Sequence, residues 1–450
     1  MKENSLGTEK ITVLVLKMSI PVVISMSMQA IYNVADSIFL SHYSEIAFGG
    51  VSIIQPLLLI SLALANGIGA GSGSLLSTLL GRKDLDGARK SISTGWSIAL
   101  LMGFLCSLLL FVLAEPFSLH FTSDVVASDA AISYLRMISP SISLVFISSL
   151  LSFFLQSHGM AKRAMVMQTS GALVNIVLDP VLIFYFDMGA KGAALASAIG
   201  YSVTALLAFL FYFRSVCLKS CLGFSFPCAK RIFAVALPAT MVQGAGPIVG
   251  IVLNKMIISY SIEVMAVYGM YLKTESFMFL ASQGISSALI VIVGYNYGMG
   301  NIERVKRSFK LSLLLSWSVM VIGFVFFQLF SKNIISVFTN DPYLIEIGVP
   351  AFKSLCFCFL LTAPNIVMTG LLQGLGKGWM SLVITYTRFF IFLIPFSFIL
   401  NKLFGLSGLW FCYFSADIPT LFLLIWIYRY VDKTMFSSTN CNRKMFANGR

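Results

Sequence analysis

Charged residues are scarce in this chain of 450 residues: Lys, Arg, Asp and Glu together make up only 11% of it, against about 25% in a typical soluble domain. Hydrophobic residues make up 58%, and the mean hydropathy is +0.89. A water-soluble fold of this size could not bury so much apolar surface. The composition therefore excludes a cytosolic enzyme, a secreted disulfide scaffold and a disordered chain, and it predicts a polytopic membrane protein.

Residue types that carry covalent or metal chemistry are equally sparse. The three His are scattered, and neither a nucleophile motif nor a metalloprotease helix is present. The eight Cys are scattered too, and Cys217 and Cys221 have no His nearby to complete a zinc site. We therefore expect reduced thiols, no enzymatic activity and no cofactor.

Long apolar runs fill most of the chain. A helix needs about 20 apolar residues to cross the hydrocarbon core, and the sequence holds twelve such runs. Lipid offers the backbone no hydrogen-bond partners, so we expect all of them to be α-helices. The runs are 11–41, 46–79, 91–114, 132–157, 163–186, 190–213, 231–260, 265–293, 307–330, 349–374, 380–400 and 405–430.

Basic residues are concentrated on one side of the predicted membrane. The N-terminus, the loops after even-numbered runs and the C-terminus hold 22 of the 31 Lys and Arg, and the opposite loops hold 3. By the positive-inside rule, this bias predicts that both termini are cytoplasmic. The net charge of +13 thus reflects topology, and we expect no nucleic-acid partner.

The two halves of the sequence align at a constant offset, the one that places Pro21 on Pro238. Six helices per half give both halves the same orientation, so the repeat is parallel and predicts an all-α membrane protein of twelve helices in two six-helix lobes. Two lobes facing each other across a central cleft are typical of transporters. We expect an N-terminal lobe at 1–213, a cytoplasmic linker at 214–230, a C-terminal lobe at 231–430 and a cytoplasmic tail at 431–450. Further aligned residues include Gly81 and Gly298, Thr122 and Thr339, Gln156 and Gln373 and, with the offset one position shorter, Gly189 and Gly405.

Charges inside the apolar runs are the sharpest functional signal, because each is costly in lipid. For the long bases, a structural ion pair or a snorkelling side chain is the simpler interpretation. Asp cannot snorkel far, so an intramembrane Asp points more strongly to function. The acids are Asp36, Asp179, Glu275 and Asp417, and the bases nearest the centres of the runs are Lys255, Lys273 and Arg388.

Four oxygen-bearing residues of the first half are predicted at similar depth. Asp36 lies roughly 8 Å from the outer end of its run, and Asp179 and Ser197 lie roughly 12 Å from theirs, at about 1.5 Å per residue. Asn175 lies one turn from Asp179 on the same face. Carboxylates, an amide and a hydroxyl suit a hard cation such as Na⁺. The same carboxylates, desolvated and close together, could bind and release protons instead. Asp36 aligns with Leu253, so we expect only the first lobe to bind the ion.

Proline and glycine add two expectations. Pro21 lies inside the first run and predicts a bend whose angle depends on the charge of Asp36, and Pro238 repeats it in the second half. The glycines at positions 67, 69, 71 and 73 lack the strand and the Lys of a phosphate-binding loop. They predict close helix packing instead.

Several stretches resemble the MATE family, the multidrug and toxic compound extrusion transporters, and in particular a bacterial multidrug-efflux branch. The resemblance covers about residues 10–430. It implies two six-helix lobes and export of cationic or amphipathic drugs in exchange for Na⁺ or H⁺ by a monomer in the bacterial cytoplasmic membrane. The stretches are MSIPVVISMSMQAIYNVADSIFLS from Met18, GRKDLDGARKS from Gly81, NIVLDPVLIF from Asn175, GAALASAIG from Gly192 and SVFTND from Ser336.

The resemblance also implies roles for individual residues. Asp36, Asn175, Asp179 and Ser197 match the family's cation-coupling site, with Ser197 standing where many members have Thr, and Pro21 matches the bending proline. Some members keep a coupling acid in the second lobe, for which Glu275 is the candidate, with Lys273 and Lys255 placed to neutralise it. Residues that match the substrate cavity are Gln29, Tyr32 and Tyr134, with Glu275 on the opposite lobe.

Three alternatives remain. A flippase for lipid-linked precursors, from the same superfamily, needs bases in its cleft, and Lys255, Lys273 and Arg388 could supply them. The paired acids of the first lobe favour a drug antiporter instead. A membrane-embedded enzyme would need a nucleophile or a metal set, and a channel would not need two lobes with acids in only one of them.

Overall fold

The computed structural model describes residues 5–122, 124–216 and 223–436. This part of the chain is helical, without strands, and holds twelve helices long and apolar enough to cross a membrane. Its five Cys are free, whereas Cys217, Cys221 and the tail beyond residue 436 lie outside the described residues. The expected all-α, twelve-helix architecture is therefore confirmed.

Ten of the twelve crossings correspond to one α-helix each, two of them extended by a short π-helix, and two crossings are built from several pieces. The elements are α1 (Ser5–Thr8), α2 (Ile11–Tyr43), α3 (Glu45–Gly81), α4 (Leu85–Phe121), α5 (Val125–Ser157), α6 (Ala161–Pro180), η1 (Val181–Tyr185), α7 (Gly189–Ser215), α8 (Phe226–Ile258), α9 (Ile262–Gly298), α10 (Ile302–Ser336), α11 (Pro342–Leu355), η2 (Cys356–Cys358), α12 (Phe359–Gly374), α13 (Gly378–Tyr386), η3 (Thr387–Leu393), α14 (Ile394–Trp410), α15 (Cys412–Val431) and η4 (Asp432–Phe436).

Several helices extend beyond the apolar runs, because some of them begin at polar caps rather than where the hydropathy changes. The predicted run 91–114, for example, belongs to α4, whose first turn is capped by the Asp84 carboxylate accepting a hydrogen bond from the Gly87 amide at 2.8 Å. The predicted break between the last two runs, at 400–405, is confirmed. Gly405, with φ +60° and ψ −143°, is non-helical and kinks α14 at this point.

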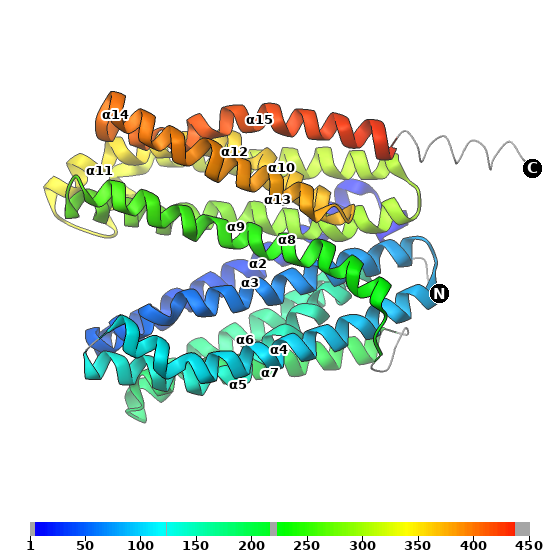
Figure 1. Cartoon of the computed structure of the whole chain (residues 1–450), viewed down its shortest axis with the longest axis horizontal. Helices are drawn as coiled ribbons and strands as arrows, with labels where there is room; N and C mark the ends of the chain where they lie inside the picture. Colours follow the sequence, from blue (N-terminus) through cyan, green and yellow to red (C-terminus); the bar gives the residue numbers. More distant parts are fainter. Residues whose placement is uncertain (1–4, 123, 217–222, 437–450) are drawn as a thin grey trace, which may run out of the picture.

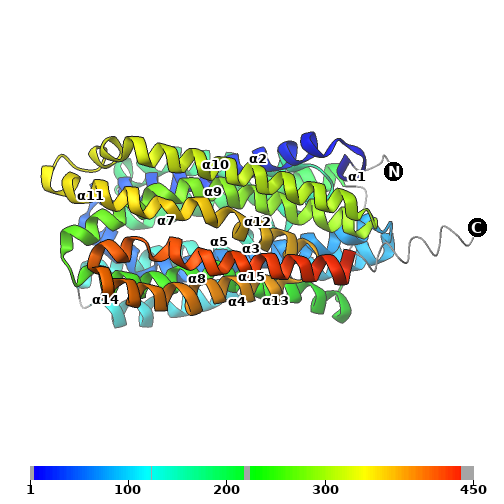
Figure 2. The same cartoon turned by 90° about the horizontal axis from the view of Figure 1, so that it is seen from above.

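The helices form two lobes. Figure 1 shows α2 to α7 in one bundle and α9 to α15 in the other, with α8 starting beside the first bundle and running into the second. In the perpendicular view of Figure 2, most helices run side by side along the long axis of the molecule. The lobes meet where α2 contacts α9 and where α3 contacts both α8 and α9.

The glycines at positions 67, 69, 71 and 73 of α3 lie where neighbouring helices approach closely. A Cβ atom on Gly67 or Gly71 would lie 2.6 Å from the Ala236 carbonyl oxygen or 2.5 Å from that of Ile232, both on α8. Gly69 and Gly73 face Phe153 of α5. The prediction that these glycines serve helix packing is confirmed.

Near their last turns, α3 and α9 cross in a symmetric contact that joins the two lobes. A Cβ atom on Gly81 would collide with the Tyr295 carbonyl oxygen, and one on Gly298 would collide with that of Thr78. The offset of the internal repeat relates the two contacts, because it places Gly81 on Gly298 and Thr78 on Tyr295. Positive φ angles recur at aligned turn positions as well: Lys83 and Gly300, Gly159 and Gly376, Gly189 and Gly405.

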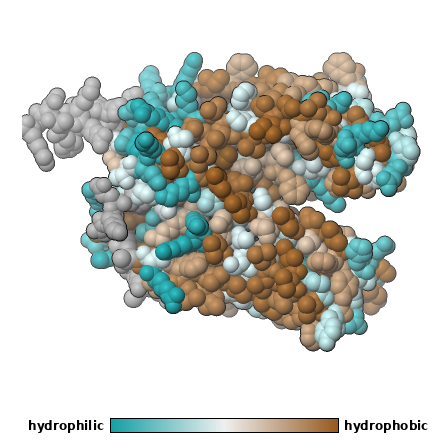
Figure 3. Space-filling model, turned by 180° about the vertical axis from the view of Figure 1, so that it is seen from behind, coloured by the Kyte–Doolittle hydropathy of each residue, from teal (hydrophilic) through white to brown (hydrophobic). Residues whose placement is uncertain are grey.

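At the same end of the molecule, the start of the chain is hydrogen-bonded to the second lobe. Arg304, at the start of α10, donates hydrogen bonds to the backbone carbonyls of Leu6 (3.3 Å) and Glu9 (2.9 Å) and to the Asn296 side chain (2.9 Å). The opposite end is open: Figure 3 shows a notch between the lobes at the end away from the chain termini, and apolar side chains cover much of both lobes between hydrophilic ends. By the predicted topology, this open end is the outer one.

Candidate ion site and central cavity

Close packing of α6 on α7 brings the first two predicted site residues together. A Cβ atom on Gly200 would lie 2.8 Å from the Gly171 carbonyl oxygen, so the two helices touch at these glycines. One turn further along each helix, the Asn175 amide donates a hydrogen bond to the Ser197 hydroxyl at 3.2 Å. The same amide nitrogen lies 3.4 Å from the Asp179 carboxylate.

The two predicted acids lie beside this pair. Asp179 is fully buried on α6, and Asp36, only 8% exposed, lies on α2 close enough to interact with it electrostatically. Three buried oxygens have no hydrogen-bond partner among the described residues: Oδ1 of Asp36, Oδ2 of Asp179 and Oδ1 of Asn175. Buried carboxylate oxygens without partners are costly. The arrangement therefore has the capacity to accept a cation or protons.

Three tyrosines surround the acids. The hydroxyls of Tyr32 and Tyr201 lie 3.1 Å apart, and Tyr134 is buried within electrostatic range of both acids. The predicted Tyr32 and Tyr134 thus lie next to the acids, and Tyr201 on α7 is a member that the sequence analysis missed. Its only signal in the sequence was a polar group four residues after Ser197, on the same helix face.

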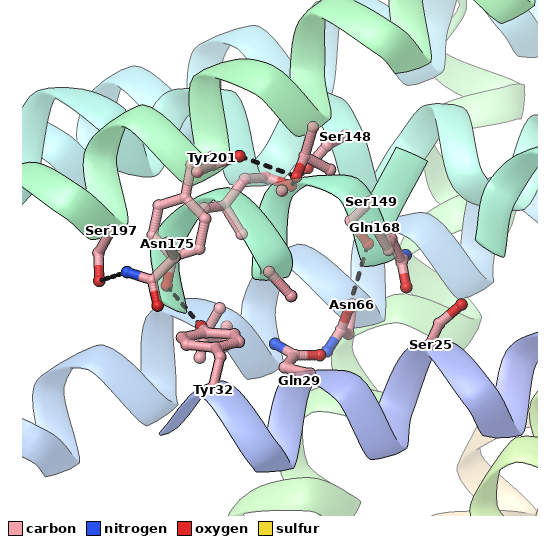
Figure 4. Close-up of a pocket in the computed structure, with 16 residues that line it drawn as sticks. Ser25, Gln29, Tyr32, Asn66, Ser148, Ser149, Gln168, Asn175, Ser197 and Tyr201 are labelled. Atoms are coloured by element: carbon pink, nitrogen blue, oxygen red, sulfur yellow. Dashed lines mark hydrogen bonds between the residues drawn. The ribbon is translucent and has the colours of Figure 1, made fainter. Parts of the chain in front are cut away.

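Two cavities open beside these residues. A small one of about 80 Å³ is lined by Tyr32 of α2, Asn175 of α6, and Ser197 and Tyr201 of α7. Figure 4 shows these side chains pointing toward one another. A larger central cavity of about 480 Å³ lies between the lobes. Both are lined by the side chains of Ser25, Gln29, Asn66, Ser149 and Gln168, so the two cavities adjoin.

Helix α2, which carries Asp36, passes through Pro21 without interruption from Ile11 to Tyr43. The Ser25 hydroxyl donates a hydrogen bond to the Pro21 carbonyl oxygen at 2.9 Å. Pro21 itself cannot donate a backbone hydrogen bond to the preceding turn. The helix is therefore weakened between its first turns and Asp36, although bending at Pro21 stays a prediction.

In the second lobe, the intramembrane charges form a different arrangement. Arg388, in the π-helix η3, binds Asp417 of α15 through two hydrogen bonds, Nε to Oδ1 at 2.5 Å and Nη2 to Oδ2 at 3.1 Å. The Thr362 hydroxyl donates to the same carboxylate at 2.8 Å. Both charged side chains are almost fully buried. A structural ion pair, the simpler interpretation for Arg388, is what the structure contains.

Glu275 lines neither of the two cavities. It is half-buried in the second lobe, within electrostatic range of Tyr271 and Arg388. Lys255 and Lys273 are exposed, and within the described residues neither forms an ion pair with Glu275. The prediction that these lysines neutralise Glu275 is wrong, because Lys273, two residues away on a helix, points to a different face.

Comparison with known proteins gives the family. The sequence model of the MatE family matches residues 21–181 and 238–399, once in each lobe. The multidrug export protein MepA of Staphylococcus aureus (strain MRSA252) is 26% identical over 428 residues, covering 92% of this chain and 93% of that protein. MepA of Staphylococcus haemolyticus is 25% identical, covering 91% of each chain.

Solved structures show the same fold. The crystal structure of MATE in the straight conformation has a TM-score of 0.91 at 23% identity, and the outward-facing conformation of a multidrug resistance MATE family transporter has a TM-score of 0.89 at 22% identity. Each comparison covers 98% of this chain and 99% of the other. The family model matches most of both lobes, and this chain therefore belongs to the MatE family.

Proposed function

We propose that this protein is a secondary antiporter that exports cationic or amphipathic drugs across a bacterial cytoplasmic membrane in exchange for Na⁺ or H⁺. Membership of the MatE family and the MepA relatives, which are named multidrug export proteins, support drug export. The observation that carries the coupling is the buried pair Asp36 and Asp179, whose unpartnered oxygens lie beside a pocket that adjoins the central cavity.

Coupling follows from competition for these two acids. With the site empty, the carboxylates attract the cationic group of a drug toward the first lobe. When Na⁺ or protons arrive from outside, they neutralise the acids and the drug loses that attraction. A ligand shifts a conformational equilibrium only by its differential affinity for the two states. The first lobe, which binds both, is therefore the lobe that changes between states.

We favour Na⁺, alone or together with H⁺, as the driving ion. Besides the two carboxylates, the site offers neutral oxygens: the unpartnered Oδ1 of Asn175 and the hydroxyl of Ser197, which touches the same amide. Neutral oxygens add to the coordination of a hard cation and are not needed to bind a proton. Drug efflux from vesicles should therefore respond to a Na⁺ gradient; strong dependence on a pH gradient with no response to Na⁺ would contradict this choice.

The decisive variant is Asp36→Asn, which keeps the shape of the side chain and removes its charge. In cells that lack other pumps, we expect drug accumulation to rise to the level of cells without the protein, at unchanged expression. Asp129→Asn, at an exposed carboxylate of α5 in the same lobe, is the matched control and should export normally. Full drug resistance of the Asp36→Asn cells would refute the coupling role.

A flippase for lipid-linked precursors is the second candidate, and one observation favours it: Arg388 lines the central cavity. A polyanionic headgroup needs several bases, however, and no other charged residue lines the cavity within the described chain. Vesicles that hold the purified protein should translocate a fluorescent drug and not a labelled polyprenyl diphosphate. Movement of the lipid alone would overturn the antiporter proposal.

A further inference from the structure

The described lining of the central cavity carries charge of one sign, which is positive. Among the described residues that line it, Arg388 alone is charged, and the other polar side chains are neutral amides and hydroxyls. Its partner Asp417 is 1% exposed and does not line the cavity. A molecule in the cavity therefore meets the side chain of Arg388 and not the carboxylate of Asp417.

Part of the guanidinium group remains available. Nε and Nη2, on one edge, are taken up by Asp417, and Nη2 also lies 3.1 Å from the Thr362 hydroxyl. Nη1 has no hydrogen-bond partner among the described residues, although Arg carries five N–H donors. The group also lies over the Phe389 ring, 5.1 Å from its centre, which holds the guanidinium plane against an aromatic wall.

The repeat places opposite charges in the two lobes. The offset that places Pro21 on Pro238 also aligns Gly171 with Arg388, and Gly171 lines the small cavity beside Asp36 and Asp179 in the first lobe. The first lobe thus has a pocket next to two acids where the second lobe has a base. Arg388 also lies in a π-helix, a feature that is frequent at functional sites.

We propose that Arg388 binds the carboxylate of zwitterionic substrates while their amine is attracted to the acids of the first lobe. This inference rests on the proposed drug export and names a substrate class for it. A guanidinium bound on one edge by a carboxylate can accept a second carboxylate on its remaining donors, in charge-assisted hydrogen bonds.

A zwitterion fits better than a simple anion. The pair of Arg388 and Asp417 is neutral overall, and Glu275 lies near it from α9, so an anion without a compensating positive group gains little there. A zwitterion brings its own positive charge, which the first-lobe acids attract. Its aromatic body would lie in the space between, against side chains such as Phe279 and Phe389.

The test uses two fluorescent probes that differ only at the carboxylate: a rhodamine with a free carboxylate and its methyl ester. Binding of each to the purified full-length protein is measured by fluorescence anisotropy. We compare wild type with the double variant Arg388→Gln/Asp417→Asn, which removes both charges and so leaves none buried alone. A lost charge-assisted hydrogen bond should raise the ratio of the carboxylate Kd to the ester Kd about tenfold or more.

The matched control is a second Arg–carboxylate pair in the same protein. Arg136 binds Glu115 at 2.6 Å and lies over the Phe111 ring at 5.9 Å, but it is exposed and lines neither cavity. The double variant Arg136→Gln/Glu115→Gln should leave the ratio of the two Kd values unchanged. An unchanged ratio in the Arg388 double variant as well, or failure of wild type to bind the carboxylate probe, would overturn the proposal.

Two further results keep the test decisive. If the double variant elutes as an aggregate, the variant Arg388→Lys replaces it. This variant keeps the positive charge but loses the forked N–H donors, so it should still raise the ratio of the carboxylate Kd to the ester Kd severalfold. Export assays separate this inference from the proposed function. If cells with the wild-type protein export the ester probe but not the carboxylate probe, the role of Arg388 is refuted while drug export stands. If they export neither probe, drug export itself is refuted.

Discussion

At the scale of single residues, the two lobes solve the problem of buried charge in different ways. In the second lobe, Arg388 and Asp417 neutralise each other permanently. In the first lobe, Asp36 and Asp179 have no basic partner among the described residues, and oxygens of both lack hydrogen bonds. A charge that is already paired needs no exchangeable ion to neutralise it. The proposed coupling therefore assigns ion exchange to the first lobe.

The ion pair of the second lobe makes a prediction about stability. Arg388→Gln alone leaves the Asp417 carboxylate buried without its partner, which typically costs about 3–5 kcal/mol. We expect this variant to unfold at a clearly lower temperature than wild type in a thermal-shift assay in detergent. The double variant Arg388→Gln/Asp417→Asn should recover most of that loss. Equal destabilisation by the single and the double variant would contradict the prediction.

Residue positions could be predicted from the sequence more reliably than residue partners. Charges inside apolar runs are conspicuous, so Asp36, Asp179 and Arg388 could be singled out directly. The partner of Arg388 could not, because Asp417 is 29 residues away and belongs to another helix. Asn175, Asp179 and Ser197 could be grouped because helical periodicity and the membrane plane limit where each can lie.

At the scale of helices, the geometry of the site depends on the contact between α6 and α7. Gly200→Ala would place a Cβ atom 2.8 Å from the Gly171 carbonyl oxygen and 3.2 Å from the Cβ atom of Asn175. Overpacking of this kind costs about 1–3 kcal/mol and would move Asn175 away from Ser197. We expect export to fall severalfold at normal expression, measured as drug accumulation.

The control for this prediction is Gly49→Ala, on α3 of the same lobe, where no atom would lie within 4 Å of the added Cβ. This variant should export like wild type. Normal export by the Gly200→Ala variant would show that the close contact of α6 and α7 does not set the site geometry.

Pro21 and Pro238 allow the two lobes to be compared. If α2 bends at Pro21 when Asp36 is neutralised, then Pro21→Ala restores a helix hydrogen bond, stiffens α2 and should nearly abolish export. Pro238→Ala, at the aligned position of α8, should reduce export only mildly, because Leu253 stands where the first lobe has Asp36. Initial rates of drug efflux from loaded cells measure both. Equal loss from the two variants would indicate that both lobes bend.

The existence of each membrane-crossing helix could be predicted from the sequence, whereas its boundaries could not. Apolar length determines whether a segment crosses the membrane, and twelve crossings were expected and found. Boundaries depend on caps, such as the Asp84 cap of α4, which hydropathy does not report. The π-helices η1 and η3 left no signal in hydropathy either, although η1 directly follows Asp179–Pro180 and η3 contains Arg388.

At the scale of the whole molecule, the internal repeat was the most informative feature of the sequence. It predicted two lobes, and the structure adds a contact between them that obeys the same offset, Gly81 with Tyr295 and Gly298 with Thr78. Which end of the cleft is open could not be predicted. A transporter needs two states of similar free energy, and the sequence encodes both.

The symmetric contact predicts how the balance between these states can be shifted. Gly298→Ala places a Cβ atom against the Thr78 carbonyl oxygen, where backbone leaves no space. The sealed arrangement should lose about 1–3 kcal/mol, which shifts the equilibrium about 5- to 150-fold toward a state with the lobes parted at this end. Spin labels at Asp86→Cys and Glu303→Cys, exposed and aligned positions of the two lobes, should report a longer distance.

The same added methyl group is harmless elsewhere on α9. Gly269→Ala has no atom within 4 Å of the new Cβ and should leave the distance between the labels unchanged. If Gly298→Ala also left it unchanged, the contact of α3 and α9 would not hold the lobes closed. A longer distance, together with slower export, would show that α3 and α9 must come into backbone contact once in every transport cycle. Glycine at positions 81 and 298 then follows from the mechanism of the whole molecule, because only a residue without a side chain lets two carbonyl oxygens approach a neighbouring helix so closely.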